Sequence, residues 1–296
     1  MAITLVSLTV LVQVTTAGAS KRTWDWDGAA RVELVHVDDL FSGGARQEDD
    51  GVRYDVRGAV EARVPGKLKL KPWLRANVER WRLLPARDLE RWSGGLDVKR
   101  GPHRLRVHGG WTNDELFFPS PTGGASLDRR DVGAELRLGF GHGLLGAVSV
   151  ERERESFNAF YRERDAVRLG LRTGLEYELG SGRTLALSHL YRRTDSVTDL
   201  YSYDHNSLRT RVEWPVAGWS TGAEAEAALR NYRTPHGYDV NHTRQDARWR
   251  LAGEVGHSVI PHLAASVFGE YRRDDSTRLG KDYHVTRLGI ALEATR

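Results

Sequence analysis

Residues 52–64 read VRYDVRGAVEARV, in which every second position is apolar, aromatic or glycine and the positions between are mostly charged. Side chains of a β-strand point alternately to its two faces, so this stretch predicts a strand with one apolar and one charged face. Pro65-Gly66 follows as a tight turn, and KLKLKPWLRANVE at residues 67–79 repeats the alternation. Together they predict an antiparallel hairpin whose two strands are amphipathic along their whole length.

The same alternation continues to the C-terminus and predicts about fourteen strands within one domain, residues 29–296. Most of them reach the roughly 9–11 residues that a tilted strand needs to cross a membrane. The predicted strands cover residues 29–40, 52–64, 67–82, 89–99, 103–113, 130–140, 143–153, 166–179, 183–193, 207–214, 221–232, 246–257, 262–272 and 283–294.

The connections between the predicted strands alternate in length. The short ones are residues 65–66, 100–102, 141–142, 180–182, 215–220 and 258–261. The longer, polar ones are residues 41–51, 83–88, 114–129, 154–165, 194–206, 233–245 and 273–282. Transmembrane barrels have short periplasmic turns and longer outer loops, and an even number of strands brings both termini to one side. We therefore expect both termini in the periplasm.

A soluble β-sandwich also has alternating strands, but its apolar faces must build a core. Here those faces are mostly Leu, Val, Ala and Gly, and the polar faces carry charges along whole strands. In a barrel, aromatic residues are expected at both ends of the strands, as girdles at the membrane surfaces. The candidates toward the short turns are Phe140, Tyr177, Trp214 and Trp219, and those toward the longer loops are Trp81, Trp92, Trp111, Tyr232, Tyr271 and Tyr283.

In this pattern the chain resembles the bacterial outer-membrane β-barrels. Arg287, Gly289, Leu292 and Ala294 in the last strand have a spacing similar to the assembly signal of that class, although the usual terminal aromatic residue is replaced by Arg296. The resemblance implies an all-β fold, a single antiparallel up-and-down barrel in the outer membrane. It also implies membrane lipid and the barrel assembly machinery as partners. It does not choose between porins, substrate channels and translocation-associated barrels.

The N-terminal segment predicts export. Residues 2–14 are an apolar run too short to span a membrane, and Ala17-Gly18-Ala19 fits a signal-peptidase site, although no Lys or Arg precedes the run. We assign residues 1–19 to a signal peptide and residues 20–28 to a short periplasmic lead.

Composition excludes several kinds of site. The chain has no cysteine, which rules out disulfides, thiolate metal sites and a cysteine nucleophile. The net charge is +4, but no basic helix or RNA-binding motif accompanies it, so we expect no nucleic-acid partner.

The lumen-facing positions carry the candidate functional residues. Arginine dominates them, and arginine both attracts anions and forms forked pairs with carboxylates. The predicted selectivity residues are Lys67, Lys69, Lys71, Trp73, Arg75, Arg104, Arg106, Arg168, Arg172, Arg209, Arg211, Arg248 and Arg250. We expect Lys67, Lys69, Lys71, Arg104 and Arg106 to form one basic wall, with Trp73 as a stacking surface for a sugar ring.

These charges are compatible with two interpretations, because barrels of about eight strands are filled by side chains while those of 16–18 strands hold a channel. An open lumen predicts a passive channel with a mild preference for small or oligomeric anionic solutes, including polysaccharide. The alternative is a closed structural, adhesive or translocation-associated barrel, in which Glu61, Glu79 and Asp97 neutralise the basic wall.

A hydrolase at the rim is a third interpretation. Asp204-His205 with Ser207, Asp282 with His284, and Asp239 with His242 offer the residue types for activating water or a hydroxyl. Each set requires a convergence in space that its spacing does not predict, so we expect no enzyme and no cofactor. His257 and His262 flank a short connection without further ligands, so we expect no metal site there. The sequence does not indicate an oligomeric state.

Overall fold

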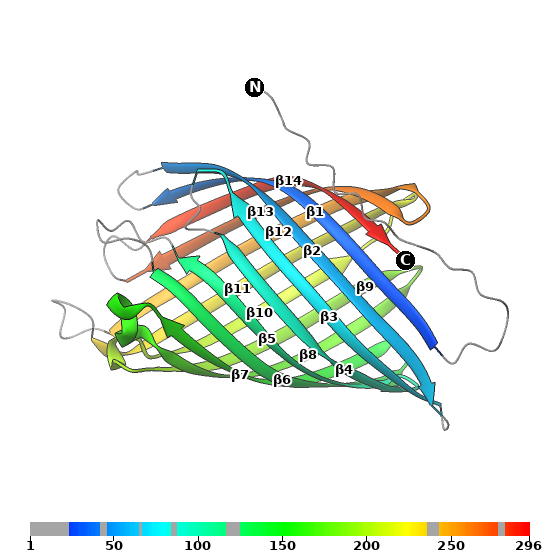
Figure 1. Cartoon of the computed structure of the whole chain (residues 1–296), viewed down its shortest axis with the longest axis horizontal. Helices are drawn as coiled ribbons and strands as arrows, with labels where there is room; N and C mark the ends of the chain where they lie inside the picture. The colour runs from blue at the N-terminus through cyan, green and yellow to red at the C-terminus, as the bar shows by residue number, and fades with distance from the viewer. Residues whose placement is uncertain are drawn as a thin grey trace.

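The computed structural model describes residues 24–41, 46–64, 67–83, 88–116, 125–235, 243–277 and 282–296, which form a closed antiparallel barrel (Figure 1). Each strand pairs with its neighbours in the sequence, and β1 (Trp24–Phe41) closes the barrel against β14 (Tyr283–Thr295), with Ala29 opposite Thr295. The other strands are β2 (Arg46–Val64), β3 (Leu68–Trp81), β4 (Leu89–Arg100), β5 (His103–Leu116), β6 (Ala125–Gly141), β7 (Leu144–Phe157), β8 (Ala166–Gly180), β9 (Arg183–Ser196), β10 (Tyr203–Glu213), β11 (Trp219–Pro235), β12 (Thr243–Ile260) and β13 (Leu263–Ser276). This is the fourteen-stranded up-and-down barrel that the alternation predicts.

The observed strands differ from the predicted ones mainly by being longer. On the side of the long connections, β2 begins at Arg46 rather than at residue 52, and β6 begins at Ala125 rather than at residue 130. Polar side chains hide the alternation there, but the backbone groups still need partners, and the neighbouring strand provides them. Residues 24–28, assigned to a periplasmic lead, are the first residues of β1 and pair with β2. The predicted signal peptide lies outside the described residues.

The two ends of the barrel differ in their connections. At one end, tight turns join the strands, and His142 (φ 50°) with Gly143 (φ 77°) has the two positive φ angles of the turn type that suits a twisted hairpin. The described chain also starts and finishes at this end, because Ala29 pairs with Thr295. The other end has the longer connections, with the short 3-10 helices η2 (Ala159–Arg164) and η3 (Asp199–Tyr201) (Figure 1). No helix in the described part of the chain is long and apolar enough to cross a membrane.

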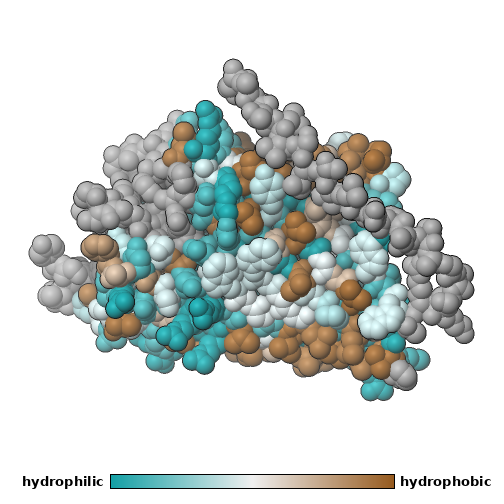
Figure 2. Space-filling view, viewed as in Figure 1, coloured by the Kyte–Doolittle hydropathy of each residue, from teal (hydrophilic) through white to brown (hydrophobic). Residues whose placement is uncertain are grey.

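The outer face of the barrel exposes large apolar side chains from many strands. Leu74 is 73% exposed, and Val132, Leu171, Leu251 and Leu288 are also more than half exposed or nearly so. Figure 2 shows hydrophobic residues along the lower middle and right of the wall, and hydrophilic residues gathered toward the end with the long connections. Such an apolar surface is unusual for a soluble protein but suits lipid around a barrel.

The expected aromatic girdle is found at the short-turn end and only in part at the other. Phe140, Tyr177, Trp214 and Trp219 are exposed on the outside, as expected. At the end with the long connections, Trp92 and Tyr271 are exposed, but Trp81 and Tyr283 turn inward and pack on Val35, Val37 and Val285. Tyr232 also faces the lumen, where its ring centroid lies 5.3 Å from that of Tyr203. The expectation for these three residues was wrong, because an aromatic side chain near a strand end can lie on either face.

Candidate functional site in the barrel lumen

The lumen contains a cavity of about 940 Å³ on the side formed by β2–β8, which we call the cavity side. Its lining follows β4 from Leu89 to Lys99, which is nearly the whole strand, and β3 from Lys71 to Glu79. A cavity that runs lengthwise along strands crossing a membrane has the direction that a solute path requires.

The cavity lining carries nine basic side chains and six carboxylates. The basic ones are Arg57, Lys71, Arg75, Arg91, Lys99, Arg104, Arg106, Arg172 and Arg296, and the acidic ones are Asp27, Glu79, Asp97, Asp131, Glu135 and Glu151. The side chains of Arg57, Arg75 and Arg91 are each more than half exposed. These three guanidinium groups are therefore accessible to a solute in the cavity.

Part of the predicted basic wall lines this cavity. Of the predicted selectivity residues, Lys71, Trp73, Arg75, Arg104, Arg106 and Arg172 belong to the lining. Lys67 lies in the turn before β3, at φ 63°, and Lys69 pairs with Glu61 at 2.7 Å outside the lining. Trp73 faces the lumen as expected, with the guanidinium carbon of Arg106 4.9 Å from the centre of its ring.

The cross-strand register reveals a row of basic residues near the short-turn end. Arg63 lies opposite Lys69, Lys69 opposite Lys99, Lys99 opposite Arg104, and Arg104 opposite Arg137. We call these five residues the basic row. Like charges directly opposite each other on one face of a sheet repel.

Carboxylates two residues away on the same strands partly neutralise the charge of the basic row. Asp97 is almost fully buried and accepts hydrogen bonds from Arg106 at 2.7 Å and 3.0 Å, while Arg104 lies 2.6 Å from its Oδ2. Arg137 likewise pairs with Glu135 at 2.7 Å. Of the three carboxylates expected to neutralise the basic wall, Asp97 and Glu61 pair with it, whereas Glu79 pairs with Arg53.

The opposite part of the lumen, formed by β9–β14 and β1, is filled by paired charges, and we call it the paired side. Four predicted selectivity residues lie there: Arg209 pairs with Glu226, Arg211 with Glu213, Arg248 with Asp274, and Arg250 with both Glu224 and Glu270. The cavity on this side measures about 300 Å³. Arg209, Arg248 and Arg250 are less exposed than the three accessible cavity arginines, whereas the side chain of Arg211 is 60% exposed although it pairs with Glu213.

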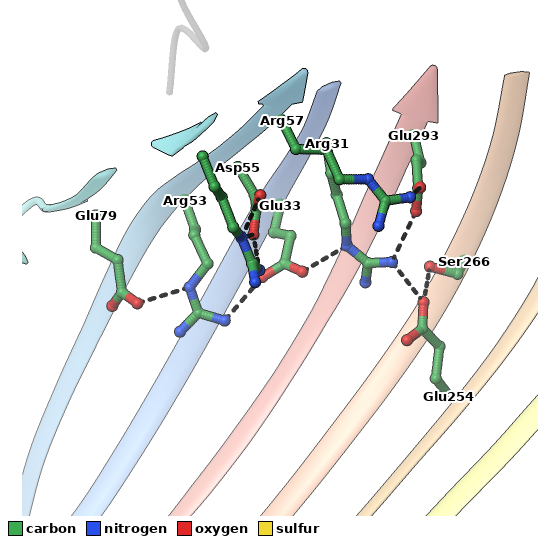
Figure 3. Close-up of polar contacts among 10 residues, drawn as sticks. Arg31, Glu33, Arg53, Asp55, Arg57, Glu79, Glu254, Ser266 and Glu293 are labelled. Atoms are coloured by element: carbon green, nitrogen blue, oxygen red, sulfur yellow. Dashed lines mark hydrogen bonds and ion pairs between the residues drawn. The ribbon is translucent and has the colours of Figure 1, made fainter. Parts of the chain in front are cut away.

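A chain of ion pairs joins the paired side to β2 and β3 (Figure 3). Glu79 accepts from Arg53 at 2.7 Å, and Arg53 donates to Glu33 at 2.9 Å. Glu33 also accepts from Arg31 at 2.6 Å, and Arg31 reaches over β14 and β13 to Glu254 on β12 at 2.8 Å. The last contact crosses a corner of the lumen, so it reduces the open cross-section as well as balancing charge.

A buried network also lies near the long-connection end of β7 and β8. Glu155 is 2% exposed and pairs with Arg129 at 2.8 Å and with Arg168 at 2.6 Å. Arg168 also donates to the Tyr203 hydroxyl at 3.2 Å. The structure therefore places Arg168, a predicted selectivity residue, in a buried network rather than in the cavity lining.

Several solved structures align with most of this chain at low sequence identity. The anion-selective porin from Comamonas acidovorans aligns with a TM-score of 0.50 and 10% identity, over 92% of this chain and 99% of that chain. OmpT, an outer membrane protein of Vibrio cholerae, gives 0.49 and 11%, over 93% and 99%. Pseudomonas aeruginosa OccK2 in complex with glucuronate gives 0.44 and 12%, over 92% and 98%. No family model and no curated protein matches the sequence.

The fold is that of the bacterial outer-membrane β-barrels. In such a barrel the apolar outer face contacts lipid, and the lumen holds the polar chemistry. The face of the wall that a candidate residue occupies therefore decides whether its side chain meets lipid or the lumen.

Among the described residues proposed for a rim hydrolase, Asp204 does not converge with His205 and Ser207. His205 and Ser207 are buried on the lumen side, whereas Asp204 accepts from the Tyr191 hydroxyl at 3.1 Å on the outside. Because neighbouring residues of a strand point to opposite faces, Asp204 and His205 cannot pair with each other. Asp282 accepts from the backbone nitrogen of Ser276 at 2.6 Å. Asp239 and His242 lie outside the described residues.

One cluster in the lumen of this outer-membrane barrel was not anticipated from the sequence. His108 on β5, Asp131 on β6 and Glu151 on β7 each offer a ligand atom, and these atoms lie within 4.8 Å of one another in the cavity lining. The sequence places each of the three on a lumen face only if the inward and outward positions of its strand are assigned correctly. Their proximity also depends on the register between the three strands.

Proposed function

We propose that the protein is a passive channel of the outer membrane with a mild preference for small or oligomeric anionic solutes. The observation that carries this proposal is the cavity along β4, whose lining has nine basic side chains against six carboxylates. A positive surplus within low-dielectric walls attracts anions. Fields are screened over about 8 Å at physiological salt, so charges on the wall of a narrow lumen still act on a solute inside it.

Trp73 adds a feature that suits a sugar acid or an acidic oligosaccharide. Its ring lies in the cavity lining beside Arg106. An aromatic face stacks on the apolar face of a sugar ring, and the exposed guanidinium of Arg75 in the same lining attracts a carboxylate. One protein of the same fold, from Comamonas acidovorans, is an anion-selective porin. That property belongs to that protein, and for this chain the cavity lining is the basis of the proposal.

The test is the reversal potential of the purified protein in a planar bilayer under a salt gradient. We expect ion conductance with a reversal potential on the anion-selective side. Changing Arg57, Arg75 and Arg91 together to Gln removes three exposed cavity charges, and we expect the reversal potential to move toward the cation side. Selectivity that does not change in this variant would contradict the proposed mechanism.

A matched control removes the same charge from the other side of the wall. Arg130, Arg193 and Arg273 lie outside the lumen, near the long connections, and each pairs with a neighbouring aspartate. Changing these three to Gln should leave the reversal potential as in the wild type. An equal shift in both triple variants would show that net charge, and not the cavity lining, sets the selectivity.

A closed structural or adhesive barrel is the second candidate, and the paired side favours it. The bridge from Arg31 to Glu254 and the apolar group of Val35, Val37 and Val285 both fill lumen space. A folded protein that inserts into the bilayer and conducts no ions would favour this candidate over the channel.

We also propose that the short-turn end, with both termini, faces the periplasm. The alternation of short and long connections supports this orientation. An epitope tag inserted at Gly123, between β5 and β6, should be labelled on intact cells, whereas a tag at Gly180 should not. Labelling at Gly180 alone would show that the short-turn end faces outward instead.

A further inference from the structure

We propose that His108, Asp131 and Glu151 form a binding site for a divalent transition-metal ion in the lumen wall. The three side chains come from the adjacent strands β5, β6 and β7, and their ligand atoms all lie within 4.8 Å of one another. They belong to the lining of the large cavity, so an ion could reach them through water.

Glycines make room for this cluster. His108 lies opposite Gly133, and Gly133 lies opposite Glu151, so the histidine and the glutamate flank a position that has no side chain. A Cβ atom at Gly133 would meet His108 Cε1 at 2.7 Å and the carbonyl oxygen of Val150 at 2.9 Å. A Cβ atom at Gly110 would meet Asp131 Oδ1 at 2.8 Å. The cluster therefore occupies space that only these two glycines leave open.

The cluster also holds buried polar atoms without hydrogen-bond partners. Asp131 is 8% exposed, and neither of its carboxylate oxygens has a hydrogen-bond partner among the described residues. His108 Nδ1 is buried and unpartnered in the same way. The nearest cations lie beyond hydrogen-bond distance, with Arg91 4.0 Å from Asp131 and Arg192 3.7 Å from Glu151.

A bound cation would satisfy these atoms directly. A buried carboxylate with no hydrogen bond is costly, and in proteins such groups are paired or coordinate metals. Ligand atoms within 4.8 Å of one another need to move inward by only about 1 Å to surround an ion at ~2.1 Å. The three ligand atoms lie this close together without an ion, so the site is nearly formed.

The ligand set indicates which ions fit. An imidazole nitrogen favours Zn²⁺, Ni²⁺ or Cu²⁺ over Mg²⁺ and Ca²⁺, which prefer oxygen ligands alone. Three protein ligands leave at least one position of the ion open toward the cavity, where water or an anionic solute group could bind. Zn²⁺ is therefore the probe of choice, with Mg²⁺ as the contrasting ion.

The experiment measures Zn²⁺ binding to the folded, detergent-solubilised protein, purified without a histidine tag, by isothermal titration calorimetry. We expect one site per chain and much weaker binding of Mg²⁺. Asp131→Asn, Glu151→Gln and His108→Asn should each weaken Zn²⁺ binding at least about tenfold, since even groups that only orient metal ligands change affinity by 10–100-fold. Glu135→Gln, a carboxylate of the same cavity lining outside the cluster, is the matched control and should bind like the wild type.

Heat-modifiable gel mobility identifies the variants that fold. The three cluster substitutions lie on three different strands, so if one variant fails to fold, the other two still test Zn²⁺ binding. Binding of Co²⁺ adds a spectroscopic readout, because its visible absorption should change when His108 is replaced. Wild-type protein that binds no Zn²⁺, or Zn²⁺ binding that all folded cluster variants retain, would overturn the proposal. Both results are independent of whether the barrel conducts ions.

Discussion

The two sides of the lumen differ in charge placement at one row of residues near the short-turn end. On the paired side, opposite charges face each other across the strands: Arg209 lies opposite Glu226, and Glu226 lies opposite Arg250. On the cavity side, the basic row places like charges opposite one another from β2 to β6, whereas the next row along these strands, Lys71, Asp97, Arg106 and Glu135, alternates in charge. Opposite charges attract across a sheet and like charges repel, so the first pattern draws side chains together and the second keeps them apart.

This difference accompanies a filled and an open region within one lumen. Where arginines alternate with carboxylates, the forked ion pairs occupy the lumen and leave a cavity of about 300 Å³. On the cavity side, where Lys99 and Arg104 of the basic row belong to the lining, about 940 Å³ remains open. We therefore expect repulsion within the basic row to help keep this side open.

The barrel wall is expected to have the same apolar outer surface on the cavity side and on the paired side. Leu171 on the cavity side and Leu251 on the paired side both face outward and are exposed. A charge at the bilayer midplane on a barrel's outside costs about 2–4 kcal/mol. Leu171→Arg and Leu251→Arg should therefore lower the free energy of unfolding in lipid vesicles by similar amounts. A large effect on one side only would show that the sides differ outside as well as inside.

Removing one arginine from each side should have unequal effects on stability. Arg250→Gln leaves Glu224 and Glu270 without their shared partner in a mostly buried setting, and we expect a loss of about 2 kcal/mol. Arg57 is 63% exposed and lies 3.5 Å from Glu293, so Arg57→Gln should cost less than about 1 kcal/mol. Denaturant unfolding followed by tryptophan fluorescence would compare them, and equal losses would contradict the distinction between the two sides.

Introduced cysteines should report which side is open, because the chain has no cysteine of its own. Ser93 belongs to the lining of the large cavity, whereas Ser207 on the paired side is 7% exposed. A water-soluble methanethiosulfonate should react with Ser93→Cys at least about tenfold faster than with Ser207→Cys, since thiol reactivity depends on access. Both variants should react alike after unfolding in urea, and equal rates in the folded barrel would mean that the paired side is also open.

The sequence predicts the walls of this molecule better than its interior. Alternation of period two was sufficient to find the strands and to place Trp73 and Arg106 in the lumen, because each strand face repeats strictly along the chain. The contacts inside the lumen depend on register, which links residues far apart in the sequence. Lys69 meets Lys99 across a hairpin, but Arg31 meets Glu254 only because the barrel closes.

The candidate metal cluster illustrates the same limit. Each of its three residues lies on a predicted strand, yet nothing local to His108 indicates that Asp131 and Glu151 will be its neighbours. The glycines that make room for the cluster carry no such signal either, since glycine is common in these strands. Aligning β6 and β7 through their short turn would bring Asp131 near Glu151, but β5 joins β6 by a long connection, so the place of His108 follows only from the strand pairing of the folded barrel.

The smallest expected effect is also the most direct test of the charge rule. Lys99 lies between Lys69 and Arg104, so Lys99→Glu would convert the centre of the basic row into the alternating pattern of the paired side. We expect it to stabilise the barrel by about 0.2–1 kcal/mol, the range for cross-strand charge pairs. Added salt should stabilise the wild type more than this variant, since screening relieves repulsion in the one and weakens attraction in the other. Lys99→Gln separates the two contributions, because it removes the repulsion without adding an attraction and should fall between the wild type and Lys99→Glu. If unfolding in low salt instead shows Lys99→Glu to be the least stable of the three, then Asp97 and Glu61 already balance the basic row, and its cations do not keep the cavity side open.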